Sequence, residues 1–202
     1  MKLYYAPGAC SLAPHIVARE LGIDLELVKV DTKTKAVASE GDFWAVNPKG
    51  YVPALELDDG AILTEVSALL QYLADRKPES GLVPKAGSME RYRLLELLGY
   101  IATEIHKGYG PLWYPATPED VKASTRAALR RRYAYIEGLL VGRPYLLGDE
   151  FSVADAYLYT VTNWSRTAKV DLTEFADLLA FQKRVGARPA VQAALKAEGL
   201  LK

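Results

Sequence analysis

The sequence has little cysteine and no long apolar run, and each scarcity excludes a class of protein. A single cysteine among 202 residues cannot form a disulfide within the chain, so a reducing, cytoplasmic setting is expected. No uninterrupted apolar stretch approaches the roughly 18–20 residues of a membrane span. The first residues also lack the apolar run of about 7–15 residues that a secretory segment needs. We therefore expect neither a membrane anchor nor a targeting segment.

Net charge is also absent, because 25 Lys and Arg residues balance 25 Asp and Glu residues. Such a chain has no overall field to recruit nucleic acid or an anionic membrane, and we expect neither as a partner. The balance conceals an asymmetry, since residues 1–80 carry a net charge of −4 and residues 81–202 a net charge of +4. This difference hints at two unlike halves within one globular protein.

Two chemical motifs are missing as well. The two histidines and Cys10 show none of the paired spacings of a metal site, so no metal is expected. Ala13 occupies the place of the second cysteine in a C-x-x-C motif, which excludes dithiol redox chemistry within the chain. A thiol partner for Cys10 must therefore come from another molecule.

The first eighty residues alternate between strand and helix signals. Short apolar runs at residues 3–6 and 25–30 are typical of strands. A helix is expected between them, from Leu12 to Gly22, with Ser11 as its N-cap. Two strands connected through a helix predict a right-handed parallel βαβ unit.

A hairpin and another helix are expected next. A turn with an Asp-Gly pair at residues 58–60 separates apolar runs at 52–57 and 61–63, which predicts a tight antiparallel hairpin. Thr64 is expected to cap a helix over residues 65–77. This order of strands and helices is the thioredoxin-like arrangement, so we predict an α/β domain over residues 1–80.

The pattern becomes entirely helical after residues 81–87, which we predict to be a linker because Pro and Gly are frequent there. One apolar stripe keeps a 4-3-4 spacing through Leu94, Leu98, Ile101 and Ile105. Ser152 and Asp155 form a variant capping box at the start of another helix. Two shorter helices are expected near the end, and we predict an all-α domain over residues 88–202.

Cys10 is the strongest candidate for chemistry. It follows the first strand and directly precedes the expected N-cap of the first helix, where backbone N–H groups and the helix dipole stabilise a thiolate. The alternative is a small buried residue used for packing, which is about as frequent for a lone cysteine. The placement between strand and helix favours a functional thiol.

Three other residues each have a structural and a functional interpretation. Pro53 inside a strand indicates an edge position, a bulge or a cis bond. Glu65 at a helix start either complements the helix dipole or accepts the ammonium group of a ligand. His106 lies beside small residues on its helix, where another helix or a ligand can approach closely.

With these residues in place, the whole chain resembles the bacterial beta-class glutathione S-transferases. The segments that carry the resemblance are residues 2–12 (KLYYAPGACSL), 47–53 (NPKGYVP), 63–65 (LTE), 71–75 (QYLAD), 104–107 (EIHK) and 145–155 (YLLGDEFSVAD). The resemblance implies a thioredoxin-like N-terminal domain that binds glutathione. It also implies an all-helical C-terminal domain that helps to form a pocket for the second substrate, and a homodimer.

The resemblance also implies roles for single residues. Cys10 would face the glutathione sulfur and can form a mixed disulfide with it, with His106 as a second catalytic residue. Val52, before a cis-Pro53, would pair its backbone with the cysteinyl unit, and Glu65 would hold the γ-glutamyl ammonium. The implied glutathione-binding residues are Tyr5, Lys35, Val52, Pro53, Glu65, Val66 and Lys107. The implied electrophile pocket is lined by Tyr109, Leu112, Trp113, Tyr114 and Trp164.

The function predicted on this basis is the conjugation of reduced glutathione to small hydrophobic electrophiles. Thiol-disulfide exchange or peroxidase activity through Cys10 is a second route, in which Cys10 itself attacks or is attacked. No cofactor is expected beyond glutathione as co-substrate. The alternative is a non-catalytic protein of the same fold that binds glutathione or a hydrophobic ligand.

Overall fold

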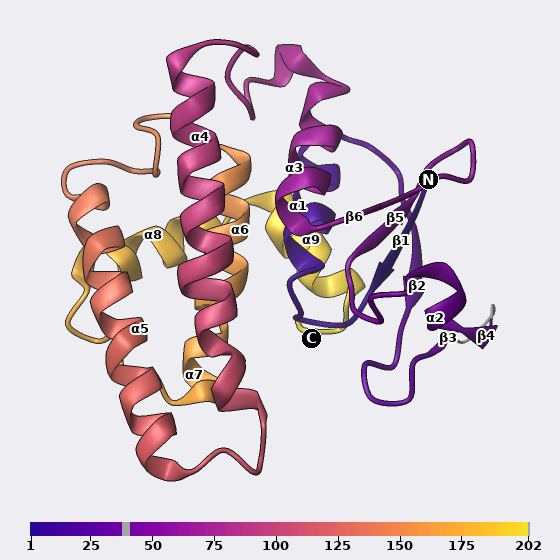
Figure 1. Cartoon of the computed structure of the whole chain (residues 1–202). Helices are drawn as coiled ribbons and strands as arrows, with labels where there is room; N and C mark the ends of the chain where they lie inside the picture. Colours follow the sequence, from indigo (N-terminus) through magenta and orange to yellow (C-terminus); the bar gives the residue numbers. More distant parts are fainter. Residues whose placement is uncertain (38–40, 202) are drawn as a thin grey trace. The chain divides into compact units, whose positions relative to one another are not determined.

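A computed structural model describes residues 1–37 and 41–201, and the chain divides into two compact units (Figure 1). The first unit comprises residues 1–80 and 187–202, and the second comprises residues 81–186. The first is built on a sheet with helices and the second is all helical, so the predicted fold class is confirmed.

The first unit contains a four-stranded sheet made of β1 (Lys2–Tyr5), β2 (Glu26–Lys29), β5 (Ala54–Glu56) and β6 (Ile62–Thr64). The strands follow the order β2-β1-β5-β6. Strand β1 pairs in parallel with β2 and antiparallel with β5, and β5 and β6 form a hairpin. The predicted parallel pair and hairpin are both confirmed. A separate short pair consists of β3 (Ala36–Val37) and β4 (Gly41–Asp42).

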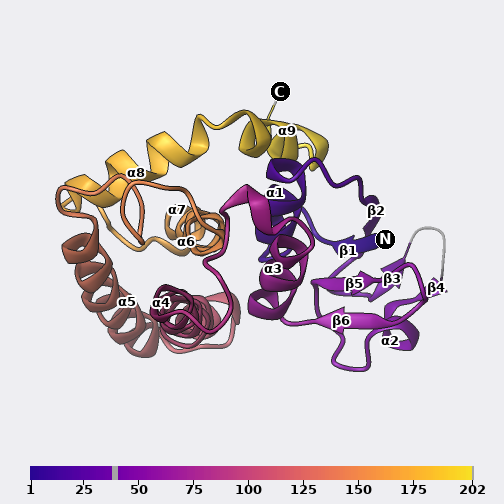
Figure 2. The ribbon, with the colours of Figure 1, turned by 90° about the horizontal axis from the view of Figure 1, so that it is seen from above.

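The two faces of this sheet bury different elements, because alternate residues of a strand point to opposite faces. Tyr4 and Ala54 belong to a buried cluster that includes Phe43 of α2 (Phe43–Val46). The neighbouring pair Leu3 and Leu55 points to the other face. Helices α1 (Leu12–Glu20) and α3 (Val66–Asp75) lie on that side (Figure 2).

Helix α9 (Pro189–Ala197) belongs to the first unit, which differs from the predicted all-α domain over residues 88–202. Its buried side chains Val191, Ala194 and Leu195 form an apolar face, and α9 packs against α1. The chain therefore returns to the thioredoxin-like unit after residue 186.

The second unit contains α4 (Met89–Tyr100), α5 (Glu119–Leu140), α6 (Val153–Thr162), α7 (Trp164–Ala168) and α8 (Ala176–Gly186). Every residue of α6 is buried, and α6 contacts α4, α7 and α8, so it forms the centre of the unit. The predicted apolar stripe of α4 and the turns after it is confirmed, because all four of its side chains are at most 1% exposed.

Residues 81–87 do not form a free linker. Leu82 and Val83 are buried, and the carbonyl oxygen of Leu82 accepts a hydrogen bond from the N–H of Val153, 3.1 Å away. The segment is therefore packed into the helical unit. Burial of its apolar residues decides the structure of this segment, although Pro and Gly are frequent in it.

Of the three predicted caps, Ser11 holds the expected N-cap position of α1 but does not cap it with its side chain, and Thr64 is wrong. The Ser11 hydroxyl makes no capping hydrogen bond to α1 and bonds to the backbone of Ala6 instead. Thr64 belongs to β6, and Glu65 holds the N-cap position of α3 with a φ of +72°. The capping box between Ser152 and Asp155 is confirmed.

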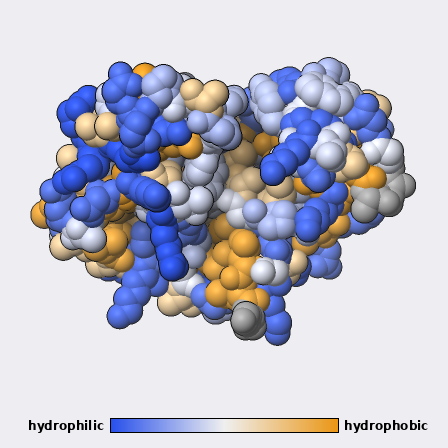
Figure 3. Space-filling view, turned by 90° about the horizontal axis from the view of Figure 1, so that it is seen from below, coloured by the Kyte–Doolittle hydropathy of each residue, from blue (hydrophilic) through white to orange (hydrophobic). Residues whose placement is uncertain are grey.

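No helix among the described residues is long and apolar enough to cross a membrane. The face shown in Figure 3 is covered largely by hydrophilic side chains, with an apolar patch at its lower edge.

Candidate active site

Cys10 lies in the loop between β1 and α1, two residues before α1 begins. Its side chain is 8% exposed, and Sγ donates a hydrogen bond to the carbonyl oxygen of Val52, 3.3 Å away. The Val52–Pro53 peptide bond is cis, and β5 begins directly after it. The thiol and the backbone of Val52, the two groups expected to face the cysteinyl part of glutathione, therefore lie side by side.

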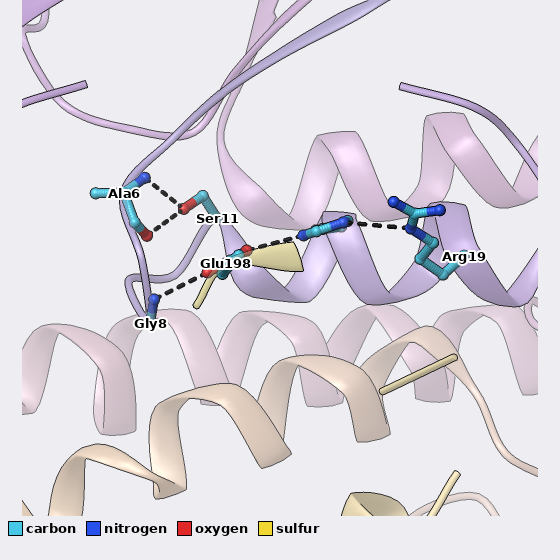
Figure 4. Close-up of polar contacts among 6 residues, drawn as sticks. Ala6, Gly8, Ser11, Arg19 and Glu198 are labelled. Carbon is cyan, nitrogen blue, oxygen red and sulfur yellow. Dashed lines mark hydrogen bonds and ion pairs between the residues drawn. The ribbon is translucent and has the colours of Figure 1, made fainter. Parts of the chain in front are cut away.

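The loop that carries Cys10 is held by hydrogen bonds on both sides of the thiol (Figure 4). The Ser11 hydroxyl accepts from the N–H of Ala6 and donates to the carbonyl oxygen of Ala6, both at 3.2 Å. The N–H of Gly8 donates to Oε2 of Glu198, 2.9 Å away. Gly8 has a φ of +70°, a conformation that side-chain-bearing residues rarely adopt. The sequence therefore fixes this loop with one glycine and two polar side chains.

Glu65 has the backbone geometry of a functional position. Its φ of +72° is unusual for a residue with a side chain, and strain of this kind costs about 1–3 kcal/mol and clusters at ligand-binding sites. The side chain is 61% exposed, and its Oε1 is paired with Nζ of Lys49 at 2.5 Å. The expected acceptor for an ammonium group is thus already holding an ammonium group.

The remaining glutathione-binding candidates in the first unit differ in what they can offer a ligand. Burial, and then the negative charge of Glu198, raises the pKa of Tyr5, so its phenol stays protonated. Lys35 has a φ of +62° and places Nζ 5.9 Å above the ring of Trp44. The side chain of Val66 is buried, so only its backbone is available to a ligand.

His106 lies in the second unit, at the end of a π-helical segment over Ile101–His106 that follows α4. π-Helical segments are rare in proteins, and those that occur are often found at functional sites. Nδ1 of His106 lies 2.6 Å from the hydroxyl of Tyr157, and its ring makes an edge contact with Trp164. Lys107, the other candidate of this unit, follows directly and is exposed.

The structure brings together three of the five residues expected to line the electrophile pocket. Trp113 stacks on Tyr109 at a ring distance of 5.9 Å, and Trp164 makes edge contacts with both rings. With His106 and Tyr157, these residues form one group, here called the aromatic cluster. Its members are His106, Tyr109, Trp113, Tyr157 and Trp164.

Two of the pocket candidates stand apart from these ring contacts. Leu112 is half-buried, and Tyr114 is 68% exposed. Tyr109 itself is fully buried, and its hydroxyl bonds to that of Tyr133 at 3.0 Å. Burial raises the pKa of both phenols, that of Tyr133 to about 12, so neither hydroxyl ionises near neutral pH.

A cavity of about 810 Å³ occupies another part of the helical unit. It lies between α4, the end of α5 and the loop before α6, with Leu97, Leu139 and Phe151 among its lining residues. None of the five electrophile-pocket candidates lines it. Within residues 1–37 and 41–201, no group of three or more His, Cys, Asp or Glu side chains is placed to hold a metal ion.

A buried chain of polar contacts, which has no signal in the local sequence, adjoins the Cys10 loop. Oε1 of Glu198 lies 2.9 Å from Nδ1 of His15, and both side chains are at most 1% exposed. Nε2 of His15 accepts a hydrogen bond from Nε of Arg19 at 3.4 Å. Because Nε2 accepts, Nδ1 is the ring nitrogen that donates a hydrogen bond to Glu198. His15 and Glu198 are 183 residues apart, and no local pattern connects them.

Family models match both halves of the chain. Residues 3–81 match the N-terminal domain of glutathione S-transferases, and residues 99–189 match the C-terminal domain. The chain is 49% identical to the glutathione S-transferase GstA of Escherichia coli O157:H7 over 99% of this chain and 100% of that protein.

Solved structures agree with the family models. A sphingomonad glutathione S-transferase in complex with glutathione has a TM-score of 0.95 and 47% identity, with full coverage of both chains. The bacterial beta-class glutathione S-transferase of Sphingomonas chungbukensis has a TM-score of 0.96 and 44% identity, also with full coverage. On this evidence the chain belongs to the bacterial beta-class glutathione S-transferases.

Proposed function

We propose that this glutathione transferase binds glutathione on its first unit beside Cys10 and conjugates it to small hydrophobic electrophiles. The observation that carries the proposal is the contact between Sγ of Cys10 and the carbonyl oxygen of Val52. A bound peptide that pairs with the Val52 backbone would bring its own cysteine close to this thiol. The sphingomonad relative was solved in complex with glutathione, which supports the choice of ligand.

In the conjugation step, the glutathione thiolate attacks the electrophilic carbon of the second substrate. A C–S bond forms. With an aryl chloride the C–Cl bond breaks and chloride leaves with the electron pair, whereas with an α,β-unsaturated ketone the C=C π bond breaks and the α-carbon takes up a proton. The thiol proton passes to solvent or to a basic group of the site. The protein contributes by holding the thiolate and the electrophile in an attacking geometry, which replaces a bimolecular encounter by a positioned one.

A second reaction, exchange with disulfides, is favoured by one specific observation. Cys10 is the single cysteine of the sequence, and its thiol lies beside the Val52 backbone. Its thiolate would attack one sulfur of a disulfide that contains glutathione, and the other thiolate would leave. The non-catalytic alternative receives no support from the comparisons.

The aromatic cluster is the proposed source of the electrophile pocket, and His106 is the proposed second catalytic residue. His106→Phe keeps a ring against Trp164 and removes Nδ1, so kcat/KM for conjugation should fall, and loss of the contact with the buried Tyr157 hydroxyl should also lower stability. The resemblance further suggests a homodimer, and sedimentation velocity would show a mass twice that of the 22.2 kDa chain.

The proposed function is tested by assaying conjugation of glutathione with an activated aryl chloride and with an α,β-unsaturated ketone. We expect saturable turnover with at least one of them. Absence of turnover with both, combined with no glutathione binding in calorimetry, would contradict the proposal.

A further inference from the structure

Polar contacts hold α9 against α1 near both ends of α9. At its start, the guanidinium of Arg188 pairs with both carboxylate oxygens of Glu20, at 2.6 and 2.9 Å. At its end, Glu198 pairs with His15. The second of these contacts extends to the loop that carries Cys10, because Glu198 also accepts from the N–H of Gly8.

Glu198 uses its two oxygens on two different elements. Oε1 accepts from His15 in α1, and Oε2 accepts from Gly8, two residues before Cys10. The Glu198 side chain is fully buried, so solvent water does not compete for its two hydrogen bonds. Removal of the carboxylate would leave buried donors without acceptors, which a structure relieves by moving the softer of the two elements. That element is the loop, because His15 is fixed within α1.

The turn after α9 also contacts the loop. A Cβ built on Gly8 would lie 3.7 Å from both terminal carbons of Leu200, so the Leu200 side chain is packed directly against this glycine. Leu200 is 43% exposed, which places it at the surface over the loop. The end of the chain therefore holds Gly8 through one hydrogen bond and one apolar contact.

From these contacts we infer that Glu198 is a positioning residue for Cys10: it sets the loop so that the thiol stands in register with the Val52 backbone. The inference rests on the proposed function, because the register is useful only for a ligand that contacts both groups. Misplacement of a reacting group by about 1 Å costs on the order of a hundredfold in rate. A loosened loop, in contrast, need not slow a small reagent that requires no register.

The test compares two reactions of Cys10 in the same protein. With glutathione disulfide, the Cys10 thiolate attacks one sulfur, the S–S bond breaks, and a glutathione thiolate leaves and takes a proton from water. With iodoacetamide, the same thiolate forms a C–S bond and iodide leaves. Both rate constants are measured by intact-mass spectrometry, and their ratio reports the register of the thiol independently of its exposure.

We expect the ratio of the two rate constants to fall at least about tenfold in Glu198→Ala and about threefold in Glu198→Gln, which retains one oxygen for the two donors. The matched control is Arg188→Gln, which breaks the fastening at the other end of α9. Its ratio should equal that of the wild type even though its melting temperature falls. If Glu198→Ala fails to fold, Glu198→Gln decides the question.

Two results would overturn the inference. An unchanged ratio in both Glu198 variants would mean that the residue serves stability alone. An equal fall in Arg188→Gln would mean that any loosening of α9 has the same effect. Failure of the proposed function looks different, because the wild type would then react with glutathione disulfide no faster, relative to iodoacetamide, than its own denatured chain does.

Discussion

In the proposed site, a ligand ammonium group that binds Glu65 must first displace Lys49. Lys49 holds its carboxylate, and both side chains are largely exposed, at 42% and 61%. Exposed ion pairs contribute about 0–1 kcal/mol, so the ammonium group of glutathione can displace Lys49 at little cost. Glu65 holds the N-cap position of α3, so its carboxylate lies near the start of this helix.

Replacement of Glu65 by Gln should raise KM for glutathione about tenfold or more, because a charged acceptor for the ligand ammonium is lost. Lys49→Gln, the matched control, removes the competing partner and should change KM by less than about threefold. Steady-state kinetics with glutathione as the varied substrate measures both. Equal small effects would mean that Glu65 serves only the ion pair with Lys49.

Single residues could be chosen from the sequence where their immediate neighbours define an environment. Cys10 was selected because it stands between a strand and a helix, and the structure places it beside Val52. Glu198 and His15 could not be selected, because their meaning arises only when the end of the chain packs on α1. A periodic pattern shows that a helix has a buried face, and it does not show what lies against that face.

At the scale of elements, the capping box of α6 is a buried carboxylate with three donors. Asp155 accepts from the N–H of Leu146 and from both the N–H and the hydroxyl of Ser152, at 2.7–2.9 Å. Complete burial raises the pKa of Asp155 to about 6. The three donors lower the pKa, but their effect is smaller than that of burial. The folded protein therefore binds a proton at Asp155 more tightly than the unfolded chain does.

This shift predicts a pH dependence of stability. Between the unfolded pKa of 3.8 and the folded value of about 6, the folded state holds the extra proton, so the contribution of Asp155 falls as pH rises through this window. Relative to Asp155→Asn, the wild type should lose up to about 3 kcal/mol between pH 4 and pH 7. Denaturant unfolding at several pH values measures the difference. A difference that rises with pH would show that the hydrogen bonds outweigh burial.

Elements were predicted well where one signal dominates and poorly where two compete. The Asp-Gly turn and the Ser152 capping box were both confirmed. Ser11 holds the expected N-cap position, but its hydroxyl accepts from the N–H of Ala6 and not from an N–H of α1. The change from α- to π-helical winding before His106 has no local sequence signal. It is followed by a close approach in which a Cβ on Gly108 would lie 2.9 Å from Leu129 of α5.

At the scale of the molecule, the all-helical pattern after residue 88 hides a return to the first unit. Residues 187–202 pack with the thioredoxin-like unit, and α9 contacts α1. A short helix near the end is expected from the sequence, but its partner is not, because neighbouring helices in sequence are the simplest partners to assume. The Cys10 loop is therefore held by contacts with Glu198 and Leu200 as well as by its own contacts with Ala6.

Two valines on either side of the boundary at residue 186 test this division. Val185 in α8 and Val191 in α9 are both fully buried, and each replacement by Ala should lower the free energy of unfolding by about 2 kcal/mol. Hydrogen exchange should then accelerate in different places. We expect Val191→Ala to loosen α1 and α3, and Val185→Ala to loosen α5 and α6. The same set of amides affected by both substitutions would contradict two separately packed units.

The most direct test of the account is the reaction of Cys10 with glutathione disulfide, followed by intact-mass spectrometry in the presence and absence of S-methylglutathione. This analogue occupies a glutathione site and has no free thiol. If Cys10 lies at the glutathione site, we expect one glutathionyl adduct that forms faster on the native than on the denatured chain. The adduct should be absent from Cys10→Ala, and S-methylglutathione should slow its formation. An adduct rate that S-methylglutathione leaves unchanged would contradict the placement of Cys10 at the glutathione site.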